Sequence, residues 1–184
     1  GQPGDVPVQA DYDGDGRADF AVWRPSAGTW HIINSSGGVR VEWFGRSGDV
    51  VVPADYDGDG RTDPATWNTS TAKWSIITSS TNTVKSFYLG APGYGGRPTV
   101  GDFNGDGRHD AAYYHPVNHN LWIRESTSEQ VTYFSTLAWP SDVLAPADYN
   151  GDGIDDVTFW TPSNGVWTVD GNLIFPFPPL RTRQ

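Results

Sequence analysis

The stretch that decides the fold of this chain is Asp11-Tyr12-Asp13-Gly14-Asp15-Gly16-Arg17-Ala18-Asp19. The phrase returns almost unchanged at 55–63, and twice more at 102–110 and 148–156 with Asn in its third position. Successive copies begin 44, 47 and 46 residues apart. A period of this size, kept along all 184 residues, predicts one domain built from four similar units. We place the units at residues 1–44, 45–89, 90–137 and 138–184.

Each copy brings several hard oxygen donors into one short turn. Carboxylate or amide oxygens occupy its first, third, fifth and ninth positions, and Gly at the fourth and sixth permits a tight bend. Such donors suit calcium better than magnesium, and soft metals would need Cys, which the chain lacks. An EF-hand would have Glu at the twelfth position, where the copies carry Val22, Thr66, Tyr113 and Phe159. The same residue types also form turns without any metal, but four copies in register argue against that alternative.

The charge of the chain agrees with a calcium-binding role. Its formal net charge is −10, and 14 of its 22 acidic residues occupy the positions just described. Without metal these carboxylates would repel one another at neutral pH. We therefore expect about four structural Ca²⁺ ions, each contributing roughly 2.7 kcal/mol when free calcium exceeds the dissociation constant a hundredfold.

The composition narrows the class of protein and its partners. Only 18% of residues are charged, 14% are aromatic, and 22 Gly and 14 Pro indicate a β-rich chain with many turns. An acidic chain lacks the basic surface that nucleic acids or anionic lipids require, and no apolar run is long enough for membrane insertion. Calcium sites of modest affinity stay filled outside cells, so we expect a secreted, extracellular protein.

Strand patterns follow each acidic loop in the same order. In the first unit we predict strands at 6–10, 20–24, 30–34 and 39–44. Each unit is then a four-stranded antiparallel sheet, and radial stacking would bury the sheet faces and protect the edges. The prediction is an all-β, four-bladed β-propeller with one calcium loop per blade. The strands predicted in the other units are 50–54, 64–68, 74–78, 84–89, 121–124, 131–134, 166–169 and 173–177.

The repeated phrase resembles the calcium-binding repeats of the FG-GAP/VCBS group, which includes integrin-α-like propellers and a fungal propeller lectin. This resemblance implies calcium-binding propeller blades without implying one activity. Propellers of the group more often have seven blades, so these four either close alone or belong to a larger ring. Residues 1–4 are similar to the connections between repeats, and we expect a fragment or a processed domain.

The resemblance also implies the metal ligands, copy by copy. The first two sets are Asp11, Asp13, Asp15, the Arg17 carbonyl and Asp19, then Asp55, Asp57, Asp59, the Arg61 carbonyl and Asp63. The last two are Asp102, Asn104, Asp106, the Arg108 carbonyl and Asp110, then Asp148, Asn150, Asp152, the Ile154 carbonyl and Asp156. Asn at the third position removes a formal charge and should weaken the last two sites.

Large aromatic residues recur at the end of the sheet opposite the metal loops. They flank the second loop of each unit and stand beside polar residues that differ between units. A flat ring can cover the apolar face of a sugar while neighbouring polar groups bond its hydroxyls. The alternative is that the rings only fill the space between blades. The candidate ligand-binding residues are Trp23, Arg24, Trp30, Trp67, Asn68, Trp74, Tyr114, His115, Trp122, Trp160 and Trp167.

These observations favour a secreted, calcium-stabilised, lectin-like module whose partner is a glycan. The alternative is an adhesion or docking module that binds an extracellular protein, either fused to other domains or as a homo-oligomer. We do not expect an enzyme, because no nucleophile–base pair or acid–base carboxylate pair can be identified. The one close histidine pair, His115 and His119, has a spacing that suits a metal only on a helix.

Overall fold

A computed structural model describes residues 1–136, 138–169 and 172–174, and these form four antiparallel sheets of four strands each. The first two sheets comprise β1 (Val6–Pro7), β2 (Phe20–Arg24), β3 (Thr29–Ile33) and β4 (Val39–Trp43), then β5 (Asp49–Val51), β6 (Ala65–Asn68), β7 (Lys73–Thr78) and β8 (Thr83–Tyr88). The last two comprise β9 (Arg97–Gly101), β10 (Asp110–His115), β11 (Asn120–Arg124) and β12 (Val131–Ser135), then β13 (Val143–Leu144), β14 (Thr158–Thr161), β15 (Val166–Val169) and β16 (Asn172–Ile174). In this part of the chain no helix is suited to crossing a bilayer.

The predicted strands are confirmed in the middle of each sheet and shortened at its first strand. β2 and β15 have the predicted bounds, β6, β7, β11 and β12 differ from them by one residue at one end, and β8 differs by one residue at both ends. The strand predicted at 6–10 is regular only over Val6–Pro7, and its ladder with the second strand resumes at one isolated bridge, Ala10 to Asp19. Of the strand predicted at 173–177, residues 175–177 lie outside the described residues.

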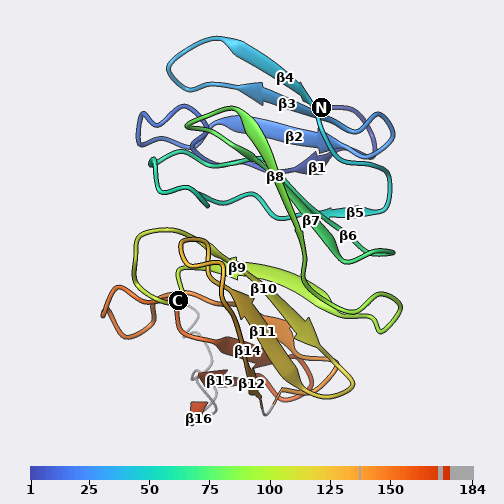
Figure 1. Ribbon diagram of the computed structural model, residues 1–184, viewed down its shortest axis with the longest axis vertical. Coiled ribbons are helices and arrows are strands. Elements are labelled where there is room, and N and C mark those ends of the chain that lie inside the picture. The colour runs from blue at the N-terminus through green and yellow to red at the C-terminus, as the bar shows by residue number, and fades with distance from the viewer. Residues whose placement is uncertain (137, 170–171, 175–184) are drawn as a thin grey trace, which may run out of the picture.

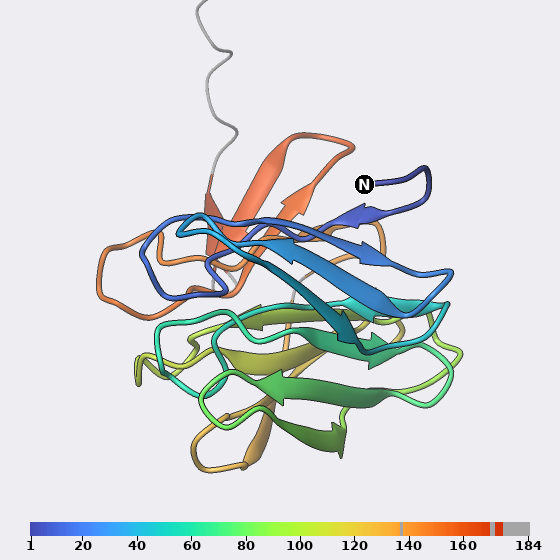
Figure 2. The same ribbon diagram turned by 90° about the horizontal axis from the view of Figure 1, so that it is seen from above.

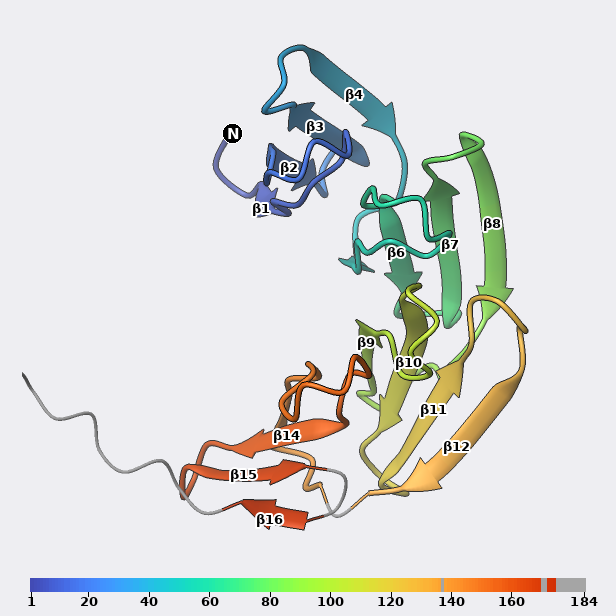
Figure 3. The same cartoon turned by 90° about the vertical axis from the view of Figure 1, so that its left-hand side faces the viewer.

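The four sheets follow one another along the molecule like the blades of a propeller (Figure 1). Figure 3 shows them along an arc, with the last strands of the sheets on its outside. Three clusters of buried side chains join the first sheet to the second, the second to the third and the third to the fourth. Among the described residues no such cluster joins the fourth sheet to the first. Four stacked blades are therefore confirmed, and closure of the ring stays a prediction.

Each blade packs one face toward the next blade and the other toward the preceding one. On β2, Ala21 and Trp23 point into the cluster shared with the second blade, while Phe20 points the other way. The residues equivalent to Phe20 in the third and fourth blades, Ala111 and Val157, are 1% and 8% exposed because the preceding blade covers them. Phe20 itself is 82% exposed, so the first blade presents an uncovered face.

Candidate metal loops and inter-blade pockets

The four acidic loops lie together on one side of the molecule (Figure 2), which we call the acidic rim. The opposite ends of the blades form the connector rim. It holds the loops at 24–29, 68–73, 115–120 and 161–166 and the connections between blades at 44–49, 89–97 and 138–143. This division follows from antiparallel pairing, because successive turns alternate between the two ends of a sheet.

The first Asp of each loop folds the turn. The Asp11 carboxylate accepts hydrogen bonds from the N–H groups of Gly14 at 2.7 Å and Gly16 at 2.8 Å. Both glycines have φ near +80°, a backbone conformation that side chains with a Cβ adopt with strain. Asp55, Asp102 and Asp148 accept the equivalent pairs of bonds. The glycines of the repeated phrase are thus explained by local geometry.

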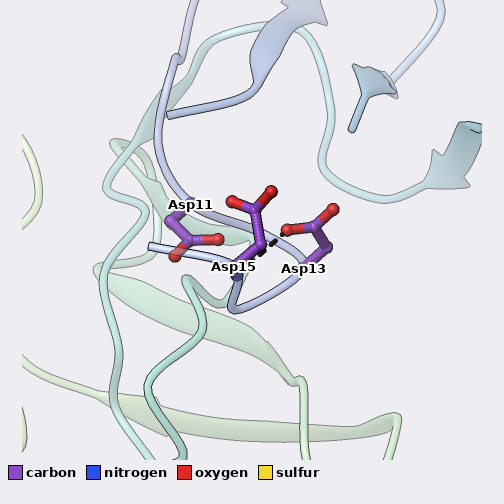
Figure 4. Close-up of side chains that lie close together, drawn as sticks. All are labelled: Asp11, Asp13 and Asp15. Atoms are coloured by element: carbon purple, nitrogen blue, oxygen red, sulfur yellow. Dashed lines mark hydrogen bonds between the residues drawn. The ribbon is translucent and has the colours of Figure 1, made fainter. Parts of the chain in front are cut away.

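Two of the loops gather three carboxylates each. Oxygens of Asp11, Asp13 and Asp15 lie within 4.8 Å of one another (Figure 4), and the carboxylates of 55, 57 and 59 form the same cluster. Oδ1 of Asp57 is buried and has no hydrogen-bond partner. A set of convergent hard oxygens with one unpaired buried member fits calcium. In the other two loops Asn104 and Asn150 hold the third position, so each of those loops has fewer acidic groups.

The carboxylates of the loops differ in their electrostatics. Desolvation opposes ionisation of Asp11, but the N–H groups of Gly14 and Gly16 outweigh it and hold its pKa below the usual value. Burial has the opposite effect at the ninth position, where it raises the pKa of Asp63 and of Asp110 to about 6. Asp63 and Asp110 are therefore costly to keep ionised.

The ninth carboxylate, predicted as a metal ligand, lies outside the clusters of three. Asp19 is 1% exposed and accepts bonds from the N–H groups of Tyr12 at 2.8 Å and Ser35 at 2.7 Å. Asp63 and Asp110 accept the equivalent pairs of N–H bonds. This residue ties the acidic loop to the turn between the third and fourth strands, and that contact explains its burial.

Hydroxyl groups that were not among the predicted site residues brace the acidic loops. Ser35 Oγ donates to Asp15 at 2.6 Å, Ser36 Oγ donates to Asp13, and Ser80 Oγ donates to Asp57 at 2.6 Å. Thr127 Oγ1 donates to Asp106 at 2.6 Å in the third blade. The signal was present as a Ser/Thr pair that begins 16 residues after the ninth Asp. In the fourth copy the equivalent residues are Asn172 and Leu173, so the Ser/Thr pair is not repeated there.

Neighbouring acidic loops are bonded to each other through the backbone. The N–H of Thr62 donates to the carbonyl of Asp11 at 2.7 Å, and His109 donates to Asp55 at the same distance. Asp155 donates to Asp102 at 2.8 Å, which repeats the link between the third and fourth blades. The Arg61 side chain packs against Gly14, where a Cβ would lie 3.0 Å from it. The acidic rim is thus one connected row.

On the connector rim, paired aromatic side chains hold the connections between blades. The indole N–H groups of Trp23 and Trp30 both donate to the Phe44 carbonyl, at 3.3 and 3.2 Å. Trp67 and Trp74 donate to the Leu89 carbonyl at 3.1 Å each. In the third blade Tyr114 and His119 contact the Ala138 carbonyl in the same way, at 2.9 and 2.6 Å.

This packing corrects five of the eleven residues of the predicted ligand-binding set. Trp23, Trp30, Trp67, Trp74 and Tyr114 are at most 3% exposed, so they offer no free ring face to a sugar. They fill the space between blades, which was the alternative interpretation of the repeated aromatics. Trp160 and Trp167 are half-buried in the fourth blade.

Trp122 was assigned to the wrong face. Trp23 lies opposite Trp30 and Trp67 opposite Trp74, but the partner of Tyr114 is Leu121. Because side chains alternate along a strand, the shift of one residue turns Trp122 to the opposite face, toward the second blade. There its ring stacks on Tyr133 with centroids 4.6 Å apart.

The junctions between blades differ in a pair of polar side chains. At the first blade Arg24 forms a 2.8 Å ion pair with Asp5 and holds the pKa of that carboxyl at about 2. At the second, Asn68 donates to Asp49 at 2.6 Å. The third blade has His115 at this position and a longer connection without the Asp. Gly96 in that connection makes room for Tyr113, because a Cβ there would lie 1.9 Å from its hydroxyl.

The altered junction opens a pocket between the second and third blades. Its volume is about 310 Å³, and it is predominantly apolar and aromatic. It is lined by Tyr88, Leu89, Gly90, Ala91, Tyr113, His115, Asn118, Trp122 and Val131. The equivalent pocket between the first and second blades measures about 260 Å³ and is polar. It is lined by Phe44, Gly45, Arg46, Asp49, Thr66, Asn68, Thr71, Lys73, Ser75 and Tyr88. Of the candidate ligand-binding residues, His115, Trp122 and Asn68 line these pockets, whereas Arg24 pairs with Asp5.

Solved structures similar to this chain are propeller-like and about twice its size. Virginiamycin B lyase from Staphylococcus aureus shares 17% identity at a TM-score of 0.59, over 96% of this chain and 57% of its own. An Agrocybe aegerita lectin, described as recognising non-reducing terminal N-acetylglucosamine, shares 17% identity at a TM-score of 0.65, over 92% and 50%. The chain thus spans about half of these structures, and the likeness concerns the fold. A comparison with curated proteins finds no match.

The sequence profile of the FG-GAP-like repeat matches residues 11–66 and 55–113. Together the two matches cover more than half of the 184 residues, and each begins at the first Asp of an acidic loop. The match agrees with the loop geometry and the repeated blades described above. This chain belongs to the FG-GAP-like repeat family.

Proposed function

We propose that this chain is a secreted carbohydrate-binding module whose sugar site is the aromatic pocket between the second and third blades. The observation that carries the proposal is the junction at His115, which differs from those of the first two blades. There the polar pair seen at Arg24 and Asn68 is absent, and half-buried Trp122 and exposed Tyr88 border an open cavity instead.

The chemistry of the pocket suits a sugar ring. Trp122 and Tyr88 supply aromatic faces for apolar C–H groups, and His115 and Asn118 supply groups that bond hydroxyls. A volume of about 310 Å³ is enough for one or two sugar units. A lectin among the structures of similar fold supports the proposal by analogy.

Calcium has a structural role in this proposal. Each of the four loops holds one ion, tightest where three carboxylates converge and weaker where Asn replaces the third. The pocket lies on the connector rim, away from the ions, so the metal shapes the blades without touching the ligand. The proposal includes no catalytic step.

A protein ligand is the second candidate, and large exposed side chains favour it. Trp43, Tyr133 and Trp139 are 79%, 60% and 66% exposed. Exposed aromatics of this kind are enriched at protein interfaces. An adhesion or docking role would use this outer surface in place of the pocket.

Glycan-array binding and calorimetry of the calcium-loaded protein test the primary proposal. Trp122→Ala should abolish glycan binding, while Trp43→Ala, which removes an exposed tryptophan outside both pockets, should leave it intact. Thermal unfolding in parallel shows whether either variant is merely misfolded. Binding that survives Trp122→Ala, or an array without any binding glycan, would contradict the proposal and favour a protein partner.

The uncovered face of the first blade bears on ring closure. Because Phe20 occupies a position that the preceding blade covers at later junctions, we propose that a further blade or the fourth blade covers it in the native assembly. Small-angle X-ray scattering distinguishes the outcomes, since a closed ring has a smaller maximum dimension than the arc in Figure 3. A profile that matches the open arc for the native protein would contradict closure.

A further inference from the structure

The aromatic pocket and the polar pocket share one residue. Tyr88, at the end of β8, lines both the aromatic pocket between the second and third blades and the polar pocket between the first and second. Its side chain is 72% exposed. A ligand longer than one sugar could therefore continue from one pocket to the other across this ring.

The polar pocket presents two cationic side chains. Arg46 and Lys73 are both exposed at its lining, and neither belongs to an ion pair among the described residues. The other charged lining residue is Asp49. Both of its oxygens already accept hydrogen bonds, from the Asn68 amide at 2.6 Å and the Arg46 backbone N–H at 2.9 Å.

This local balance is opposite to that of the whole chain. The protein carries a net charge of −10, yet the side chains that line this pocket sum to a positive charge. An arginine fork and a lysine ammonium that line one cavity are suited to a carboxylate, which the arginine can bind with two hydrogen bonds. The neighbouring hydroxyls of Thr71 and Ser75 can bond a sugar ring.

We propose that the natural ligand is an acidic oligosaccharide that spans both pockets. A uronate-type carboxylate lies against Arg46 and Lys73, the chain crosses the ring of Tyr88, and a neutral sugar occupies the aromatic pocket at Trp122. This inference rests on the proposed carbohydrate-binding function and assigns its ligand class.

A hyaluronan oligosaccharide, which alternates glucuronate with N-acetylglucosamine, is a suitable probe, and its carboxyl-reduced form is the matched neutral control. In calorimetry with calcium present, the acidic form should bind at least about tenfold more tightly than the reduced form. This difference is expected because the reduced form lacks one charge-assisted hydrogen bond. Arg46→Gln combined with Lys73→Gln should remove that difference, and added salt should reduce it. Lys85→Gln is the control, because Lys85 is an exposed lysine on β8, the strand of Tyr88, and lies outside both pockets. It should leave the difference between the two probes unchanged.

The outcomes separate this inference from the function on which it rests. Equal affinity for both probes, or a difference that persists in the double variant, contradicts the acidic ligand. If binding still depends on Trp122, the proposed carbohydrate-binding function is retained. Absence of binding to either probe overturns the acidic ligand, and a glycan array without any binding sugar overturns both. Tyr88→Ala should lower the affinity for both probes. An unchanged affinity in this variant would contradict a ligand that crosses between the pockets.

Discussion

The two rims of the molecule are built from the same repeats but have diverged to different degrees. On the acidic rim, the first Asp of every loop accepts the same pair of glycine N–H bonds, and a backbone bond joins each loop to the next. On the connector rim, the polar group beside the buried aromatic changes from Arg24 to Asn68 to His115. The constant rim serves stability, and the variable rim is where a specific ligand site can arise.

Removing calcium should have the largest effect on stability. Four independent sites at a hundredfold excess of free calcium contribute about 11 kcal/mol, so chelation with EDTA should lower the melting temperature by on the order of 20 °C or more. Scanning calorimetry before and after dialysis measures the shift, and restored calcium should reverse it. An unchanged melting temperature would show that the acidic rim is stable without metal.

The buried aromatic residues of the connector rim should show the next largest effect. Trp74 is fully buried and donates to the Leu89 carbonyl, so Trp74→Ala should destabilise the fold by about 3–5 kcal/mol. Trp43→Ala, at a residue 79% exposed, should change stability by no more than about 0.5 kcal/mol. Urea denaturation with calcium present compares the two. Similar losses would contradict the assignment of the paired aromatics to packing.

Exchanging the third loop position should alter calcium affinity more than stability. Asp13→Asn makes the first loop like the third, and Asn104→Asp does the reverse. We expect the first change to weaken one site and the second to strengthen one, each on the order of tenfold, because ligand charge tunes affinity. Calorimetric calcium titration measures both. Asp49→Asn, a carboxylate on the connector rim, is the control and should leave calcium binding unchanged.

The repeated phrase was sufficient to predict the blades and the acidic loops, because both depend on local sequence. Gly14 and Gly16 are required by a single turn, and the apolar run after Asp19 forms β2 with the predicted bounds. Local patterns also placed six strands of the later units, β6, β7, β8, β11, β12 and β15, to within one residue at each end. The first strand, β1, is shorter than predicted because its pairing with the next segment is interrupted and resumes only at the bridge of Ala10 to Asp19. Composition alone does not reveal this interruption.

The ligand pockets could not be predicted in the same way, because they depend on contacts between blades. Repetition of Trp suggested that Trp122 continues the series, whereas strand pairing gives that place to Leu121. The Asp5 partner of Arg24 lies 19 residues away, and no spacing rule links the two. The aromatic pocket combines residues 88–91 with 113–122, a junction that exists only after two sheets have packed.

Backbone bonds join the four acidic loops, so an ion bound in one loop would affect binding in the next. Asp11 orders its own turn through its carboxylate and holds the next loop through its carbonyl, which accepts from Thr62. An ion that fixes one turn therefore pre-orders its neighbour, and calcium should bind with positive cooperativity along the row. The amide protons of Thr62, His109 and Asp155 would exchange with solvent more slowly as successive sites fill, so each reports on one link in this cooperative series.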